Sequence, residues 1–91
     1  MKYIIRRTNQ FKRDIKKIIK TGYDIEKLLT TVEMIANGQK LPKKYKDHPL
    51  KGKSIGKRDC HIEPDWLLIY ALEDDELVLY RTGSHSDLFK I

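Results

Sequence analysis

The chain contains three histidines, His48, His61 and His85, and each lies in a short polar motif. Histidine is the side chain whose unperturbed pKa lies nearest to neutral pH, so it can accept or donate a proton under physiological conditions. Three such groups in a basic chain of 91 residues predict proton-transfer chemistry on an anionic substrate.

The charge is positive and unevenly distributed. Nineteen Lys and Arg against thirteen Asp and Glu give a net charge of +6. The segment 40–58 holds eight Lys or Arg, including the candidate substrate-binding residue Lys51, and one acid, Asp47. Four acids lie together at 73–76. A basic surface attracts phosphate backbones, so we predict a nucleic-acid partner in preference to a merely solvated basic face.

A metal centre or a cysteine nucleophile would be alternative uses of these side chains. The sequence has no Cys-x-x-Cys pair and no His-x-x-x-His helix motif. Cys60 and His61 are adjacent, and neighbours on a strand point to opposite faces. We therefore predict no metal site, and we expect Cys60 to be a small buried hydrophobe.

Metal-free cleavage of RNA fits the three histidines and their polar neighbours better. RNA carries its own nucleophile, the 2′-hydroxyl, so the enzyme must supply a base, an acid and positive charge for the phosphorane oxygens. The histidines and Asp65 could transfer the protons, and Arg81 could hold the phosphate. Trp66 or Phe89 could stack on an unpaired base.

Two helices and a first strand precede these residues. A β-branched and aromatic segment at 2–6 predicts a strand. Apolar residues at helical spacing predict one helix that starts at Thr8 or Asn9 and stops at Gly22, and a second that runs from Asp24 to Gly38. Their apolar stripes should pack on a sheet.

A long basic loop and a meander of three strands follow. Pro42 and Pro49 predict that 39–53 is irregular, and so long a loop in a small domain is often functional. Strands are expected at 58–62, 66–72 and 77–82, with the middle one central because it is apolar on both faces. The tail 84–91 should form one turn or a short edge strand.

The expected fold is therefore α+β, in the order β-α-α-β-β-β, as a single domain spanning residues 1–91. A helical hairpin should cover one face of an antiparallel-rich sheet, and polar strand residues should point to the other, partly open face. The meander can bring His61 and Arg81 to the same edge as Asp65 and Trp66. The loop that carries His48 could fold over that edge.

We expect a cytoplasmic protein. No segment approaches the roughly 20 apolar residues that cross a bilayer. The basic N-terminal segment is too short and too charged for a signal peptide. A single cysteine cannot form an internal disulfide.

Three segments resemble the YafQ branch of the RelE-like toxins of bacterial toxin–antitoxin systems. They are LPKKYKDHPLKG at 41–52, RDCHIEPDWLLIY at 58–70 and RTGSHSDLF at 81–89. Chain length and element order also agree, so the resemblance covers essentially the whole chain and implies a RelE-like microbial RNase-type fold.

By this resemblance, the protein would be an mRNA interferase that cuts message in the ribosomal A site without a cofactor. A cognate DinJ- or RelB-like antitoxin would hold it inactive, and operator DNA would be bound only through the antitoxin complex. The open alternatives are a non-enzymatic, ParE-like gyrase inhibitor and a nucleic-acid-binding module.

The resemblance also implies residue roles. His85 would be the general acid, and Arg81 would stabilise the transition state. Phe89 would help to place the nucleotide. Asp59 would have a supporting role. The candidates for the base and for holding the phosphate are His48, His61 and Asp65.

Overall fold

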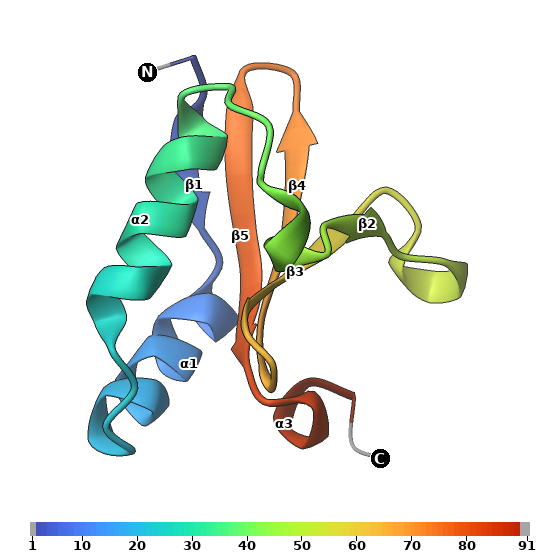
Figure 1. Cartoon of the computed structure of the whole chain (residues 1–91). Helices are drawn as coiled ribbons and strands as arrows, with labels where there is room; N and C mark the ends of the chain where they lie inside the picture. The colour runs from blue at the N-terminus through green and yellow to red at the C-terminus, as the bar shows by residue number, and fades with distance from the viewer. Residues whose placement is uncertain (1, 90–91) are drawn as a thin grey trace.

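The computed structural model describes residues 2–89 and contains one five-stranded sheet with two long helices on one face (Figure 1). The strands are β1 (Ile4–Arg7), β2 (His48–Pro49), β3 (Arg58–Glu63), β4 (Trp66–Glu73) and β5 (Glu76–Gly83). The helices are α1 (Asn9–Lys20), α2 (Ile25–Ala36) and the short α3 (His85–Phe89). The predicted α+β class and element order are confirmed.

The strand order is β1-β5-β4-β3-β2. Strands β3, β4 and β5 form the predicted antiparallel meander. Strand β1 lies parallel to β5 at the far edge, a position that the sequence did not predict. As expected, β4 is central, and its first six residues are buried.

Both long helices begin at the capping residues that the sequence indicated. The Thr8 hydroxyl accepts a hydrogen bond from the Phe11 amide at 3.0 Å, and the Asp24 carboxylate accepts one from the Glu26 amide at 3.1 Å. The apolar stripes then bury Phe11 in α1 and Leu28 in α2 against the sheet. This core fixes one face of the sheet and leaves the other for polar groups.

The basic loop is more regular than predicted. It contains the 3₁₀ turns η1 (Lys43–Tyr45) and η2 (Gly52–Ser54), and between them β2 pairs with β3. The prediction that prolines exclude regular structure from 39–53 was therefore wrong. Pro49 is tolerated because β2 is an edge strand, where a missing amide donor costs no internal ladder bond.

Two contacts hold this loop on the sheet. The Asp47 carboxylate accepts a hydrogen bond from the Tyr70 hydroxyl at 2.7 Å and from Arg58 Nε at 3.2 Å. Since Tyr70 belongs to the central strand, the residue next to His48 is tied directly to the core.

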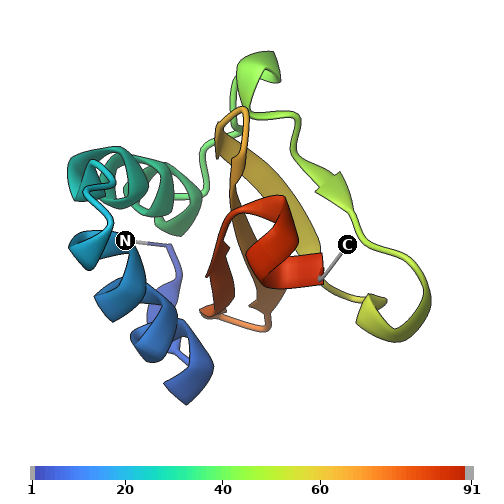
Figure 2. The same ribbon diagram turned by 90° about the horizontal axis from the view of Figure 1, so that it is seen from below.

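The chain after β5 forms α3, a single helical turn at the lower end of the sheet, as Figure 2 shows from below. This confirms one of the two predicted forms of the tail, and its last two residues lie outside the described part. Among residues 2–89, no helix has the length and apolar character needed to cross a membrane.

Candidate active site

Side-chain alternation along β3 separates the core from the candidate site. Cys60 is fully buried in the core beneath the helices. Its neighbours Asp59 and His61 therefore point to the opposite face. Burial raises the pKa of the Cys60 thiol, which keeps it protonated. The expectation that Cys60 is a buried hydrophobe is confirmed.

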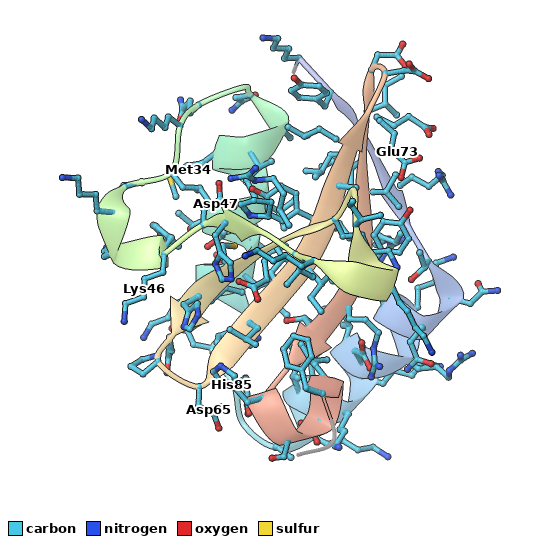
Figure 3. The ribbon with its side chains drawn as sticks, turned by 90° about the vertical axis from the view of Figure 1, so that its right-hand side faces the viewer. Met34, Lys46, Asp47, Asp65, Glu73 and His85 are labelled. Carbon is cyan, nitrogen blue, oxygen red and sulfur yellow. The ribbon has the colours of Figure 1, made fainter. Side chains whose placement is uncertain are left out.

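His85 and Asp65 form the shortest contact of the site. His85 Nδ1 lies 2.6 Å from Asp65 Oδ1, and the His85 backbone amide donates to the same oxygen at 3.0 Å. Figure 3 shows the two side chains together at the lower end of the sheet. The backbone hydrogen bond and the imidazole hold the pKa of the Asp65 carboxyl below its usual range. Asp65 therefore stays ionised beside His85.

His61 and Phe89 flank His85. The His61 and His85 rings meet edge to face with centroids 5.6 Å apart, and the centroids of His85 and Phe89 are 6.4 Å apart. The sheet register produces this proximity, since His61 pairs with Leu67 and Leu67 pairs with Gly83, two residues before His85. Phe89 is 40% exposed, so its ring can receive a base.

His48 reaches the same face from β2, where it pairs with Asp59. Its Nδ1 atom lies 2.9 Å from the Lys46 carbonyl oxygen and 3.1 Å from Asp59 Oδ1. The carbonyl takes the hydrogen bond, and Asp59 Oδ1 has no hydrogen-bond partner of good geometry among residues 2–89. The contact between His48 and Asp59 is therefore an ion pair when the imidazole is protonated.

Asp59 is a buried carboxylate in front of all three histidines. Burial raises its pKa, and the nearby His48, His61 and His85 oppose that rise only in part. The family resemblance implied only a supporting role for Asp59, although its alternation with Cys60 could have placed it on the site face.

Arg81 shares the site face but is not a free cation. It pairs with Ile69, which in turn pairs with Asp59 across the meander. A bulge at Tyr80 shifts the register just before Arg81, and bulges often redirect side chains near active sites. The guanidinium donates to Asp14 of α1 through Nε at 2.9 Å and Nη2 at 3.1 Å.

Of the hollows that border the site, two contain His61 or Arg81. One, of about 320 Å³, is lined by Lys57, Arg81 and Phe89, and by Ile69 of the sheet. The other, of about 560 Å³, lies between α2 and the basic loop and includes Lys44, Lys46 and His61. The first hollow is lined by cations and no acid, whereas the second also contains Glu26 and Glu63, and Glu63 pairs with Lys27.

Two predicted residues lie apart from this cluster. Trp66 is only 2% exposed, packs edge-on against Tyr23 and donates its indole N–H to the Thr82 hydroxyl at 2.9 Å. It belongs to the core on the helix side, so the structure does not support the stacking role that the sequence suggested. Lys51 is exposed in the basic loop immediately before η2.

The match to known proteins settles the family. A family model described as "Bacterial toxin of type II toxin-antitoxin system, YafQ" covers residues 3–90. The chain belongs to the YafQ toxin family. The resemblance based on the three sequence motifs is thereby confirmed, and the five-stranded architecture is that of solved YafQ structures.

Relatives of this YafQ-family toxin include proteins of Escherichia coli and Helicobacter pylori. It is 45% identical to the mRNA interferase toxin YafQ of Escherichia coli K12 over 83 residues. This alignment covers 90% of each chain. The E. coli DinJ–YafQ complex matches with a TM-score of 0.88 and 44% identity over 96% of this chain and 98% of that one. A metal-bound toxin from Helicobacter pylori matches with a TM-score of 0.90 and 43% identity over 96% and 99%.

The metal of the H. pylori toxin has no evident ligand set in this YafQ-family toxin. In the part of the chain that the structure describes, no group of three or more His, Cys, Asp or Glu side chains is placed to hold a metal ion. The carboxylates nearest to the histidines already contact them individually, as Asp65 does with His85. We therefore derive no step through a metal.

Proposed function

We propose that this YafQ-family toxin is an mRNA interferase that cuts message on the ribosome by metal-independent acid–base catalysis, with the RNA 2′-hydroxyl as nucleophile. The observation that supports this most strongly is the 2.6 Å contact between His85 and Asp65, with His61 and Phe89 against the same imidazole. An ionised carboxylate at Nδ1 stabilises the imidazolium and leaves Nε2–H free to donate a proton.

His85 is accordingly the proposed general acid, which protonates the leaving 5′-oxygen. His48 and His61 remain the candidates for the base, together with Asp65. Asp59 lies near both of these histidines and favours their protonated forms once a proton has been taken up. Arg81 would stabilise the charge on the phosphorane, and the half-exposed Phe89 would stack on a base.

The proposed partners follow from the family and from the charge. The E. coli relative forms a complex with DinJ. We therefore propose that a DinJ-like antitoxin inhibits this toxin, and that operator DNA is bound only through the complex of this toxin with its antitoxin. Lys57 and Arg81 in one hollow and Lys44 and Lys46 in the other suit an RNA backbone. A ribosome-bound substrate would place the protein in the cytoplasm.

The direct test is primer extension on one message, presented either on translating ribosomes or as naked RNA. We expect cleavage within the reading frame only when the message is translated, and no cleavage when the antitoxin is added first. Equal cleavage of naked RNA would contradict the ribosome dependence. Intact message together with inhibited DNA gyrase would contradict the nuclease and indicate a ParE-like toxin.

A further inference from the structure

Asp14 is the one acidic residue in α1, and it is buried on the apolar side of that helix. Burying a charged group is costly unless it is paired and hydrogen-bonded. Asp14 is fully engaged: it accepts from Arg81 Nε and Nη2, from the Thr82 amide at 3.1 Å and from Gln10 Nε2 at 3.1 Å. The buried Asp14 carboxylate therefore holds the donor groups that bind it in fixed positions.

The bidentate geometry determines how Arg81 can act. Two parallel N–H bonds to one carboxylate fix the plane of a guanidinium as well as its position. They use Nε and Nη2 and leave the Nη1 amino group for another acceptor. The side chain remains about one-third exposed and lines the hollow that also contains Phe89 and Lys57. Arg81 is thus held rigidly at the wall of the site.

The same carboxylate also fixes the chain that leads to the proposed acid. Thr82, whose amide binds Asp14, accepts the Trp66 indole N–H through its hydroxyl and donates to the Leu67 carbonyl at 2.8 Å. Only Gly83 and Ser84 separate Thr82 from His85. One buried network therefore connects α1, Arg81 and the start of the segment that carries His85.

We propose that Asp14 is a positioning residue for catalysis, which aims the Arg81 guanidinium at the scissile phosphate by clamping its Nε and Nη2 atoms. This inference rests on the proposed nuclease function. Asp14 does not touch the RNA. Without it, Arg81 keeps its charge but loses its fixed direction, so transition-state stabilisation falls while the affinity for RNA does not.

The test measures single-turnover cleavage of ribosome-bound message over a range of toxin concentrations. We expect Arg81→Ala to lower the maximal rate by about 10²–10³-fold. Asp14→Asn should lower it by about 10- to 100-fold, the scale of a misplaced catalytic group, with an unchanged or lower half-saturating concentration. Asp24→Asn removes the same charge at the N-cap of α2, where Asn caps equally well, and should cleave like the wild type.

A double variant separates positioning from general stability. If Asp14 acts through Arg81, Asp14→Asn should cost nothing further in the Arg81→Ala background. A purely structural Asp14 would cost as much there as in the wild type. Arg81→Lys keeps the charge without the bidentate bond and should lower the maximal rate as Asp14→Asn does. It therefore tests the proposal even if Asp14→Asn does not fold.

Chemical rescue gives an independent readout. Millimolar guanidinium should partly restore cleavage to Arg81→Ala, because the Asp14 carboxylate can bind it in the vacated place, and it should not restore the double variant. Rescue that is absent, or equal in both, contradicts the inference. Wild-type cleavage by Asp14→Asn beside a defective Arg81→Ala overturns the role of Asp14 alone. A folded Arg81→Ala variant that cuts normally overturns the proposed role of Arg81 itself.

Discussion

At the scale of single residues, the site holds two contacts between a histidine and an aspartate, in opposite environments. Asp65 is exposed, and hydrogen bonds from His85 lower its pKa. Asp59 is buried, and burial raises its pKa beside His48. Environments that separate two similar groups are a common basis for separate acid and base roles. This contrast supports His85 as the acid and directs attention to His48 for the base.

Replacing Asp65 by Asn should slow cleavage by about 10- to 100-fold, because an amide cannot stabilise the His85 imidazolium as a carboxylate does. The fold should be unaffected, since the Asp65 side chain is 69% exposed. Asp74→Asn makes the same charge change at the hairpin tip, where Asn tolerates the positive φ of 54°. Primer extension with both variants checks this prediction. Equal cleavage rates for the two variants would count against the proposed role of Asp65 beside His85.

Replacing Asp59 by Asn should raise the melting temperature at neutral pH. A raised folded-state pKa means that the folded protein binds the proton more tightly than the unfolded chain does. Asp59 therefore destabilises the fold once pH rises above the unfolded-state pKa of about 4, and more so until its folded-state pKa is passed.

Thermal melts of the wild type and of Asp59→Asn from pH 3 to 8 measure this difference. The advantage of the variant should shrink as pH falls toward about 4 and lower, where the aspartate is protonated in both states. A constant difference across the range would contradict the assignment. Slower cleavage by the more stable variant would indicate that stability is sacrificed for the site.

At the scale of elements, the strand ends and one loop bring the proposed catalytic groups together. Bulges interrupt the ladder between His61 and Glu63 and at Tyr80 before Arg81. The basic loop is held by Asp47, which lies over the sheet in Figure 3 and bonds Arg58 and Tyr70. Because His48 directly follows Asp47, the anchor and one candidate for the base share one short segment.

Tyr70→Phe should lower the free energy of unfolding by about 1 kcal/mol, since it removes one hydrogen bond to Asp47 and keeps the packed ring. Asp47→Ala should cost more, about 1–3 kcal/mol, because it also strips Arg58 of its partner. Both should slow cleavage in the same order. Tyr80→Phe, which removes the exposed bond to Glu73, is the matched control for the free energy of unfolding. Urea denaturation measures the stabilities, and single-turnover experiments measure the cleavage rates. A larger effect of Tyr70→Phe than of Asp47→Ala would contradict the role of Asp47 as the anchor of the loop.

At the scale of the whole molecule, charge is arranged along the sheet. The acidic turn between β4 and β5 lies at the upper end in Figure 1, and α3 lies at the lower end, where Figure 3 shows Asp65 and His85. The basic loop begins near α2, with which it lines a hollow, and then continues through β2 and η2 on the far side of β3 from the long helices. Such an asymmetric field favours approach of an anionic partner with the histidine end first.

Replacing Lys43, Lys44 and Lys46 by Gln should weaken binding to ribosome-bound message and make it less sensitive to salt. The slope of log affinity against log salt should fall by about 2, the value for three lost contacts to single-stranded phosphates. The matched control replaces Lys12, Lys16 and Lys20 of α1. Filter binding over a salt series checks this, and an unchanged slope would remove the loop from the interface.

Much of this architecture could be predicted because it depends on local chemistry. Thr8 and Asp24 cap helices through their own side chains, and the apolar run of β4 is visible in the sequence. Two placements depend on long-range pairing instead. Strand β1 joins β5, which lies some 70 residues away, and the two-residue β2 is too short to show any periodicity.

The site could be predicted only as a set of candidates. The histidines, Asp65, Arg81 and Phe89 do gather on one face of the sheet or at its end. Trp66 was placed there too, because a strand that is apolar on both faces does not reveal which side a residue takes. Asp14 is absent from the predicted set, although an acid three residues after Phe11 on an apolar stripe is a visible anomaly.

The central claim is that His85 donates the proton to the leaving oxygen, and primer extension on translated message with His85→Ala tests it most directly. The variant should stay folded, since His85 is 43% exposed, and should lose about 10²–10⁴-fold in cleavage rate while still binding the ribosomal complex. A folded His85→Ala variant that cuts message at the wild-type rate would contradict the account.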